Sequence, residues 1–204
     1  MRAAAVGRVP RGVARDRVRN SLLEAARALF DEVGYDAATT ADIAARAGVS
    51  QRTLFRYFGC KEDVVLDWLD DYNRRLCERL RKRPADEPVF EALRRGLDLF
   101  CHLPDDVTER SRVVRRLAEE APALQARLLS KYDEWESHIA DELRARGVAT
   151  IQAALLACFA IGTLKVAFRD VPLHPGRTVE DLIDEGFEVL KGRRPLRIAP
   201  SNDG

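Results

Sequence analysis

The chain has 204 residues, of which 46% are hydrophobic and 33% charged. This composition is typical of a soluble globular protein with room for one or two domains, and it excludes an intrinsically disordered chain. The net charge of +1 conceals an asymmetry between the two parts of the chain. Residues 1–60 contain ten arginines and six acidic residues, which gives a charge of +4. Residues 61–204 contain 24 basic and 27 acidic residues, which gives a charge of −3. A basic amino-terminal part is expected where a protein meets a polyanion such as DNA. An arginine-rich tail is the alternative, because residues 2–19 supply six of the arginines.

We expect a cytoplasmic protein that does not associate with a membrane. The start is interrupted by arginines and lacks the apolar core of a signal peptide. The longest apolar run, about residues 153–164, is shorter than the roughly 20 residues that cross a bilayer. The cysteines show no CxxC spacing and no pairing pattern, so reduced thiols are expected at Cys60, Cys77, Cys101 and Cys158.

Apolar residues recur every three or four positions along the chain, which predicts an all-α protein without strands. The expected helices of the first part are one ending at Gly34, two short ones over about 40–47 and 51–57, and a long one over 61–83. Beyond Pro84 and Pro88 the expected helices run from about Phe90 to before Pro104, and over 106–119, 122–147, 150–170 and 179–190. The fold class is therefore all-α with about nine helices.

Residues 39–58 carry the signals of two short helices around a tight turn. Thr39 is an N-cap candidate, and Asp42 stands at the position that completes a capping box. Gly48 permits the left-handed backbone of the turn, and Ser50 can cap the second helix. The apolar residues expected to face inward are Ile43, Ala44, Ala47, Val49, Leu54 and Phe58. This arrangement is a helix-turn-helix, whose second helix can enter a DNA major groove.

The outward face of the second short helix is polar. Gln51 can bond adenine through both the oxygen and the nitrogen of its side-chain amide, Arg52 and Arg56 can bond guanine, and Thr53 can pack its methyl group on thymine. The candidate phosphate contacts are Thr39, Thr40, Tyr57 and Lys61, and Ser50 completes the set. The alternative is a plain helical hairpin with a solvated face, since arginine and glutamine are common on surfaces.

The stretch from about Arg17 to Val65 resembles the TetR family of transcriptional regulators. The resemblance rests on Leu29-Phe30 and Gly34-Tyr35 before the turn, the turn itself, and Lys61-Glu62-Asp63 after it. It implies a three-helix DNA-binding domain over 1–60, a linking helix over 61–83, and a ligand-binding and dimerisation domain over 84–204. It also implies DNA contacts by Thr39, Gln51, Arg52, Thr53, Arg56, Tyr57 and Lys61. Many members have tyrosine where this chain has Phe55, so we expect no polar contact there.

The family's last two long helices pair with those of a second copy, and the residues expected in a homodimer interface here are Leu155, Phe159, Ile183, Phe187 and Leu190. The alternative is that these residues close the core of a monomer. A small-molecule pocket is expected among residues 87–170, with Phe100, Cys101, Trp135, His138 and Phe159 as candidates for its wall. Each of these is also an ordinary core candidate. The carboxyl-terminal part is weakly similar to members that bind acyl-CoA-like ligands.

Together these features predict a ligand-responsive repressor that binds a near-palindromic DNA operator and is released by a small-molecule inducer. No catalytic constellation, metal-ligand spacing or cofactor motif is found, and the three histidines stand far apart. We therefore expect a protein that is not an enzyme. A purely structural helical dimer would have no need of the basic reading face. A thiol-based redox-sensing regulator remains an alternative, because Cys60 precedes Lys61 at a helix N-terminus, where a thiolate is favoured.

Overall fold

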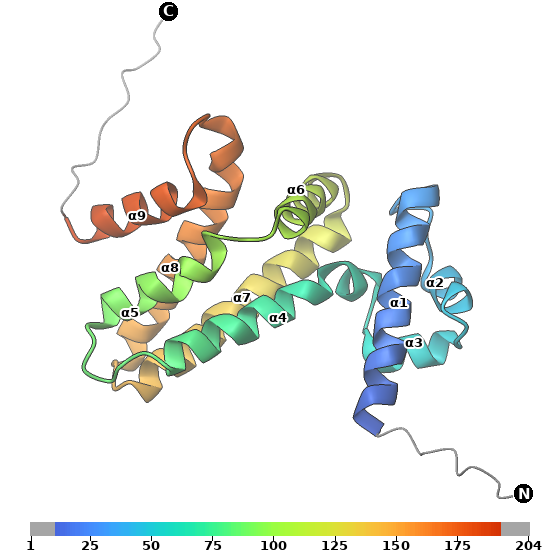
Figure 1. Ribbon diagram of the computed structural model, residues 1–204, viewed down its shortest axis with the longest axis horizontal. Helices are drawn as coiled ribbons and strands as arrows, with labels where there is room; N and C mark the ends of the chain where they lie inside the picture. Colours follow the sequence, from blue (N-terminus) through green and yellow to red (C-terminus); the bar gives the residue numbers. More distant parts are fainter. Residues whose placement is uncertain (1–10, 193–204) are drawn as a thin grey trace, which may run out of the picture. The chain divides into compact units, whose positions relative to one another are not determined.

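The computed structural model describes residues 11–192, with side chains from residue 15 onward. Within these residues the chain is all-α, as predicted, and it forms nine α-helices and two short 3-10 segments without a strand (Figure 1). The elements are α1 (Arg11–Val33), α2 (Thr40–Arg46), α3 (Gln51–Tyr57), α4 (Lys61–Arg81), α5 (Val89–Gly96), η1 (Leu97–Phe100), α6 (Asp105–Glu120), α7 (Pro122–Ala145), α8 (Thr150–Asp170), η2 (Val171–Leu173) and α9 (Val179–Leu190).

The helix predicted from Phe90 onward is divided at its middle into α5 and the tighter η1. The division falls at Gly96, where an added Cβ would lie 2.7 Å from Cδ2 of Leu80 on α4. Such a distance is too short for a side chain, so α5 approaches α4 closely at this point. The regular apolar spacing of the sequence could not show this division, because both halves keep the same buried face.

The described residues form two compact units. The first unit holds the chain up to Trp68 together with Ser111–Leu128, and the second holds Leu69–Arg110 and the residues from Leu129 onward. Helix α4 therefore contributes its first turns to one unit and the rest to the other. This division cuts across the predicted linking helix and assigns parts of α6 and α7 to the unit of the amino-terminal helices.

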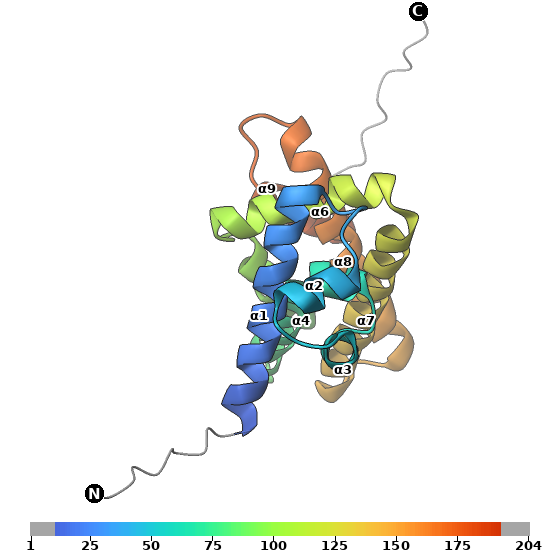
Figure 2. The same cartoon turned by 90° about the vertical axis from the view of Figure 1, so that its right-hand side faces the viewer.

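In the first unit α1 packs against α2, and α2 packs against α3 (Figure 2). The core of this unit is formed by Leu22, Ala25, Ala26, Ile43, Ala44, Leu54, Phe58 and Val64. The inward residues predicted for the two short helices are thus confirmed as buried or, for Ala47 and Val49, as packed against this core. Burial of one face of α3 leaves its opposite face exposed.

In the second unit α8 packs against α9, and α5 also packs against α9. Aromatic rings join these helices, since the Phe159 ring lies 5.1 Å from that of Phe187 and the Phe90 ring 5.4 Å from it. By length and composition alone, Thr150–Leu173 could cross a membrane. The longest unbroken apolar run in the sequence was too short to predict this. The core helix of a soluble protein meets the same criterion, so this one helix does not identify a membrane protein.

Candidate nucleic-acid interface

The turn between α2 and α3 is built as the sequence predicted. The Thr39 hydroxyl accepts a hydrogen bond from the Asp42 amide at 3.1 Å, and the Thr39 amide donates to the Asp42 carboxylate at 3.2 Å. Gly48 has a φ of +69°, in the left-handed region that favours glycine. The Ser50 hydroxyl accepts from the Thr53 amide at 3.1 Å and so caps α3. These local bonds set where α3 begins and which face it exposes.

The outward face of α3 is polar and partly organised by its own hydrogen bonds. Gln51, Arg52 and Arg56 are exposed, and Thr53 and Tyr57 are half-buried. The Gln51 amide nitrogen donates to the Thr40 hydroxyl at 2.8 Å, and the Ser50 and Thr53 hydroxyls lie 2.9 Å apart. Among the described residues no hydrogen bond or ion pair holds Arg52, so its guanidinium is available to a ligand.

Phe55 is a residue for which the sequence predicted only that it makes no polar contact. Its side chain is 48% exposed, which is unusual for so large an apolar group. The four-residue spacing from Gln51 places it on the same outward face of α3. That spacing was visible in the sequence and is the signal that identifies Phe55 as part of the exposed surface.

Several polar contacts fasten the amino-terminal helices to the start of α4. The Arg19 guanidinium donates to both carboxylate oxygens of Asp67, at 2.6 and 2.7 Å. The Tyr35 hydroxyl donates to Glu62 at 2.7 Å. Burial by itself would raise the pKa of Glu62, but the hydrogen bonds from Tyr35, Cys60 and the backbone, together with the charge of Lys61, outweigh it and lower the pKa. Burial and the hydrogen bond to Glu62 raise the pKa of Tyr35. A movement of the first turns of α4 would therefore be transmitted to the three helices.

Lys61 has internal partners that the sequence did not reveal. Its ammonium group donates to the backbone carbonyls of Tyr35 at 2.8 Å and Ala38 at 3.1 Å, and it lies 4.1 Å from the centre of the Tyr35 ring. These contacts tie the α1–α2 connection to α4. One of the three ammonium hydrogens remains for the predicted phosphate contact.

Cys60 does not have the environment of a reactive thiolate. Burial raises the pKa of its thiol, and the neighbouring acidic groups Asp63 and Glu62 act in the same direction through their charges. These effects disfavour the thiolate that was expected at the start of α4, and the redox-sensing alternative stays a prediction. Among the described residues there is also no group of three or more histidine, cysteine or acidic side chains arranged to hold a metal.

Of the five residues predicted to line a ligand pocket, Cys101 and His138 line two different cavities. Phe100 and Trp135 are buried, with ring centres 5.8 Å apart. Cys101 lines a cavity of about 470 Å³ beside α4. His138 lines a different cavity of about 660 Å³, and its Nδ1 lies 2.7 Å from the Asn73 amide nitrogen. Phe159 lies in the aromatic cluster of α5, α8 and α9.

The residues predicted for a dimer interface divide into a buried and an exposed group. Ile183 and Phe187 are 0% and 2% exposed, so they belong to the core of the second unit and cannot form a surface. Leu155 and Leu190 are exposed, and Phe159 is half-buried. The exposed Ile151 and Val166 share the face of α8 that carries Leu155, because helical spacing brings these three positions together. Ile183 and Phe187 are therefore removed from the predicted interface, and a role for the other three residues stays a prediction.

The first unit contains two short helices around a capped, glycine-centred turn, and the second of them exposes a polar face. This arrangement is the helix-turn-helix of DNA-binding proteins. A family profile described as "Bacterial regulatory proteins, tetR family" matches residues 22–67, and one described as "MftR C-terminal domain" matches residues 87–195. The chain belongs to the TetR family of transcriptional regulators.

Similar proteins agree with this assignment. The transcriptional regulator TcmR of Streptomyces glaucescens is 29% identical in an alignment of length 145 that covers 64% of this chain and 60% of TcmR. MftR of Mycobacterium tuberculosis, a regulator assigned to mycofactocin biosynthesis, is 30% identical over 55% of this chain and 57% of MftR. The matches thus span about three fifths of the length of these relatives.

Among solved structures, Thermus thermophilus FadR, a TetR family transcriptional repressor in complex with lauroyl-CoA, has a TM-score of 0.59 at 23% identity. The match covers 91% of this chain and all of FadR. At this identity the likeness shows the fold alone.

Proposed function

We propose that the chain is a ligand-responsive repressor that binds a near-palindromic duplex operator as a homodimer in the cytoplasm. The observation that carries the proposal is the exposed polar face of α3, held in place by the buried Leu54 and Phe58. Arg52 and Arg56 would bond guanine and Gln51 adenine, and the remaining contacts would be mainly to phosphates. The proposed DNA contacts are Thr39, Thr40, Ser50, Gln51, Arg52, Thr53, Arg56, Tyr57 and Lys61.

A dimer is proposed because one helix-turn-helix reads few base pairs. A twofold pair places two reading helices about 34 Å apart on successive turns of the duplex. The surface proposed to meet its counterpart is the exposed apolar face of α8, formed by Ile151, Leu155 and Val166, together with Leu190 of α9. An apolar surface of this kind on a helix is typical of a face that a partner covers.

The inducer is proposed to be a small apolar or amphipathic molecule, of the acyl-CoA type or related to it, bound by the second unit. The lauroyl-CoA complex of FadR supports this class, because FadR has the same fold. Helix α4 would carry the signal, since its residues belong to both units and its start is bonded to α1 by the Arg19–Asp67 pair. An inducer acts only by binding one conformer more tightly, with a coupling of typically ~1–3 kcal/mol.

A mobility-shift experiment on the DNA upstream of the chain's own gene tests the proposal. The wild type is expected to bind with a Kd of about 10 nM or lower at physiological salt. An Arg52→Ala, Arg56→Ala double variant should bind roughly 100-fold more weakly, because each base contact contributes about 1–3 kcal/mol. Lauroyl-CoA should weaken the wild-type complex by roughly 5- to 150-fold. If the double variant binds the operator as tightly as the wild type, the assignment of α3 as the reading helix is refuted. If lauroyl-CoA leaves the affinity of the wild type for the operator unchanged, this inducer class is refuted.

A further inference from the structure

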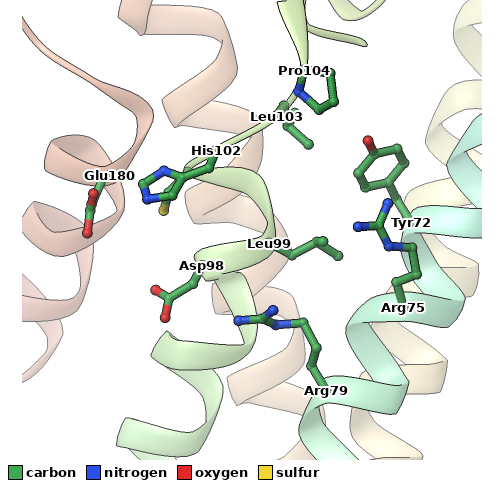
Figure 3. A pocket seen from close by; sticks show the side chains of 10 residues that line it. Tyr72, Arg75, Arg79, Asp98, Leu99, His102, Leu103, Pro104 and Glu180 are labelled. Carbon is green, nitrogen blue, oxygen red and sulfur yellow. The ribbon is translucent and has the colours of Figure 1, made fainter.

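The cavity of about 470 Å³ in the second unit is lined by charged groups from three elements (Figure 3). Arg75 and Arg79 project from α4 toward the η1 segment that carries Asp98, and Glu180 lies on the far side, on α9. The volume is within the range of about 300–1,000 Å³ that is usual for small-molecule sites. The balance of charge in this cavity decides which ligands it can accept.

The two acidic side chains of the cavity are already paired with a third arginine. The Arg94 guanidinium lies 2.5 Å from the Asp98 carboxylate and 3.6 Å from that of Glu180, and its side chain is only 12% exposed. Arg94 does not line the cavity itself, and it also pairs with Asp184, so its single positive charge offsets the two carboxylates of the cavity only in part. Burial raises the pKa of the Cys101 thiol to about 11, so this group adds no negative charge at neutral pH.

Arg75 and Arg79 have no comparable partners within residues 15–192. The Arg79 guanidinium makes one long hydrogen bond, 3.4 Å, to the Arg95 carbonyl and no ion pair. The Arg75 guanidinium lies 3.9 Å from Asp71 and stacks over the Tyr72 ring at 4.9 Å from its centre. Because the two residues are four positions apart on a helix, they stand on the same face about 6 Å apart at their Cβ atoms. The cavity thus presents Arg79 without an ion pair and Arg75 with only a long one, to Asp71.

We propose that this cavity binds an organic oxyanion, a carboxylate or phosphate attached to an apolar body, with Arg75 and Arg79 holding the anionic end. The planar guanidinium groups match the oxygens of both anions and stay charged at every physiological pH. The apolar body would contact Leu99, Leu103 and Pro104, which also line the cavity. This inference rests on the proposed function, because it names the class of inducer and places its binding site beside α4.

Titration calorimetry on the full-length protein with decanoate, decyl phosphate and decanol tests the site. Both anions should bind the wild type at least roughly tenfold more tightly than decanol, which has the same apolar body without the charge. In an Arg75→Gln, Arg79→Gln double variant the affinity for the anions should fall roughly 10- to 100-fold, and the affinity for decanol should stay the same. Arg74→Gln is the matched control, because Arg74 is on the same helix but lines the other cavity.

The proposal is overturned if decanol binds as tightly as the anions, if neither anion binds the wild type, or if the double variant binds them unchanged. The operator assay separates this site from the proposed function. Anions that bind as expected but leave the operator complex intact support the site and refute its role in release. Release of operator by lauroyl-CoA from the double variant, with the same dependence as from the wild type, supports the proposed function and overturns the arginine site.

Discussion

Replacing Lys61 by methionine should destabilise the protein as well as weaken DNA binding. The ammonium group makes two hydrogen bonds to carbonyls and one contact with the Tyr35 ring. Hydrogen bonds to a charged group contribute about 1.5–3 kcal/mol each when buried, and roughly 1 kcal/mol each at a half-exposed site. The ring contact adds about 0.5–1 kcal/mol. Methionine retains the apolar stem, so the expected loss in the free energy of unfolding is about 2–3 kcal/mol.

Thermal unfolding followed by circular dichroism measures this loss. A change of 1 kcal/mol shifts Tm by about 2–4 °C in a protein of this size, so the expected shift is roughly 4–12 °C. The protein concentration must be the same in all samples, because the proposed dimer would make Tm depend on it. Lys82→Met is the control, since Lys82 is exposed and directly follows the last residue of α4. A Tm within a degree of wild type would show that the carbonyl contacts do not stabilise the fold.

If the third ammonium hydrogen also reaches a phosphate, the slope of log K against log salt should fall by about 0.9.

Three further predictions concern other parts of the molecule. Thr39→Ala removes the capping box of α2 and should lower the free energy of unfolding by about 1 kcal/mol, whereas Thr39→Ser should not; equal losses would contradict the capping role. Leu155→Glu should shift the protein from dimer to monomer in sedimentation equilibrium while its helices stay intact, and a variant that is still a dimer would exclude the α8 face as the interface. Ile183→Ala should instead lower the free energy of unfolding, measured in urea, by about 2–5 kcal/mol. The amide and hydroxyl of Thr178 lower the pKa of Asp181 below its usual 3.8, so Asp181 stabilises the fold above that pH and ceases to do so as the pH falls through the lowered value. The difference in Tm between wild type and Asp181→Asn should therefore disappear in acid, and a difference that persists there would contradict the charge effect.

The helix-turn-helix could be predicted because its determinants are local. The bonds of the Thr39–Asp42 and Ser50–Thr53 pairs join residues three positions apart, and Gly48 needs only its own backbone. By contrast, the partners of Lys61 lie 23 and 26 positions away, and nothing in the residues near Lys61 signals them.

Which residues of the second unit are buried and which are exposed could be predicted only by region. Trp135 and His138 are three positions apart on α7, yet one is buried in the core and the other lines a cavity. Which of them faces inward depends on how α7 packs, and helical spacing does not state that. In the same way, Ile183 and Leu155 are both apolar, but only the packing of α8 against α9 decides that Ile183 is buried and Leu155 exposed.

The central claim is that the outward face of α3 reads base edges in a major groove. Methylation interference tests it most directly, because methylation of guanine N7 blocks that groove and leaves the minor groove open. On an operator selected from random duplexes, we predict that methylated guanines prevent wild-type binding in two clusters about one helical turn apart. The Arg52→Ala, Arg56→Ala variant should lose this sensitivity at specific guanines. Interference that is absent from the wild type, or identical in the variant, would contradict the account.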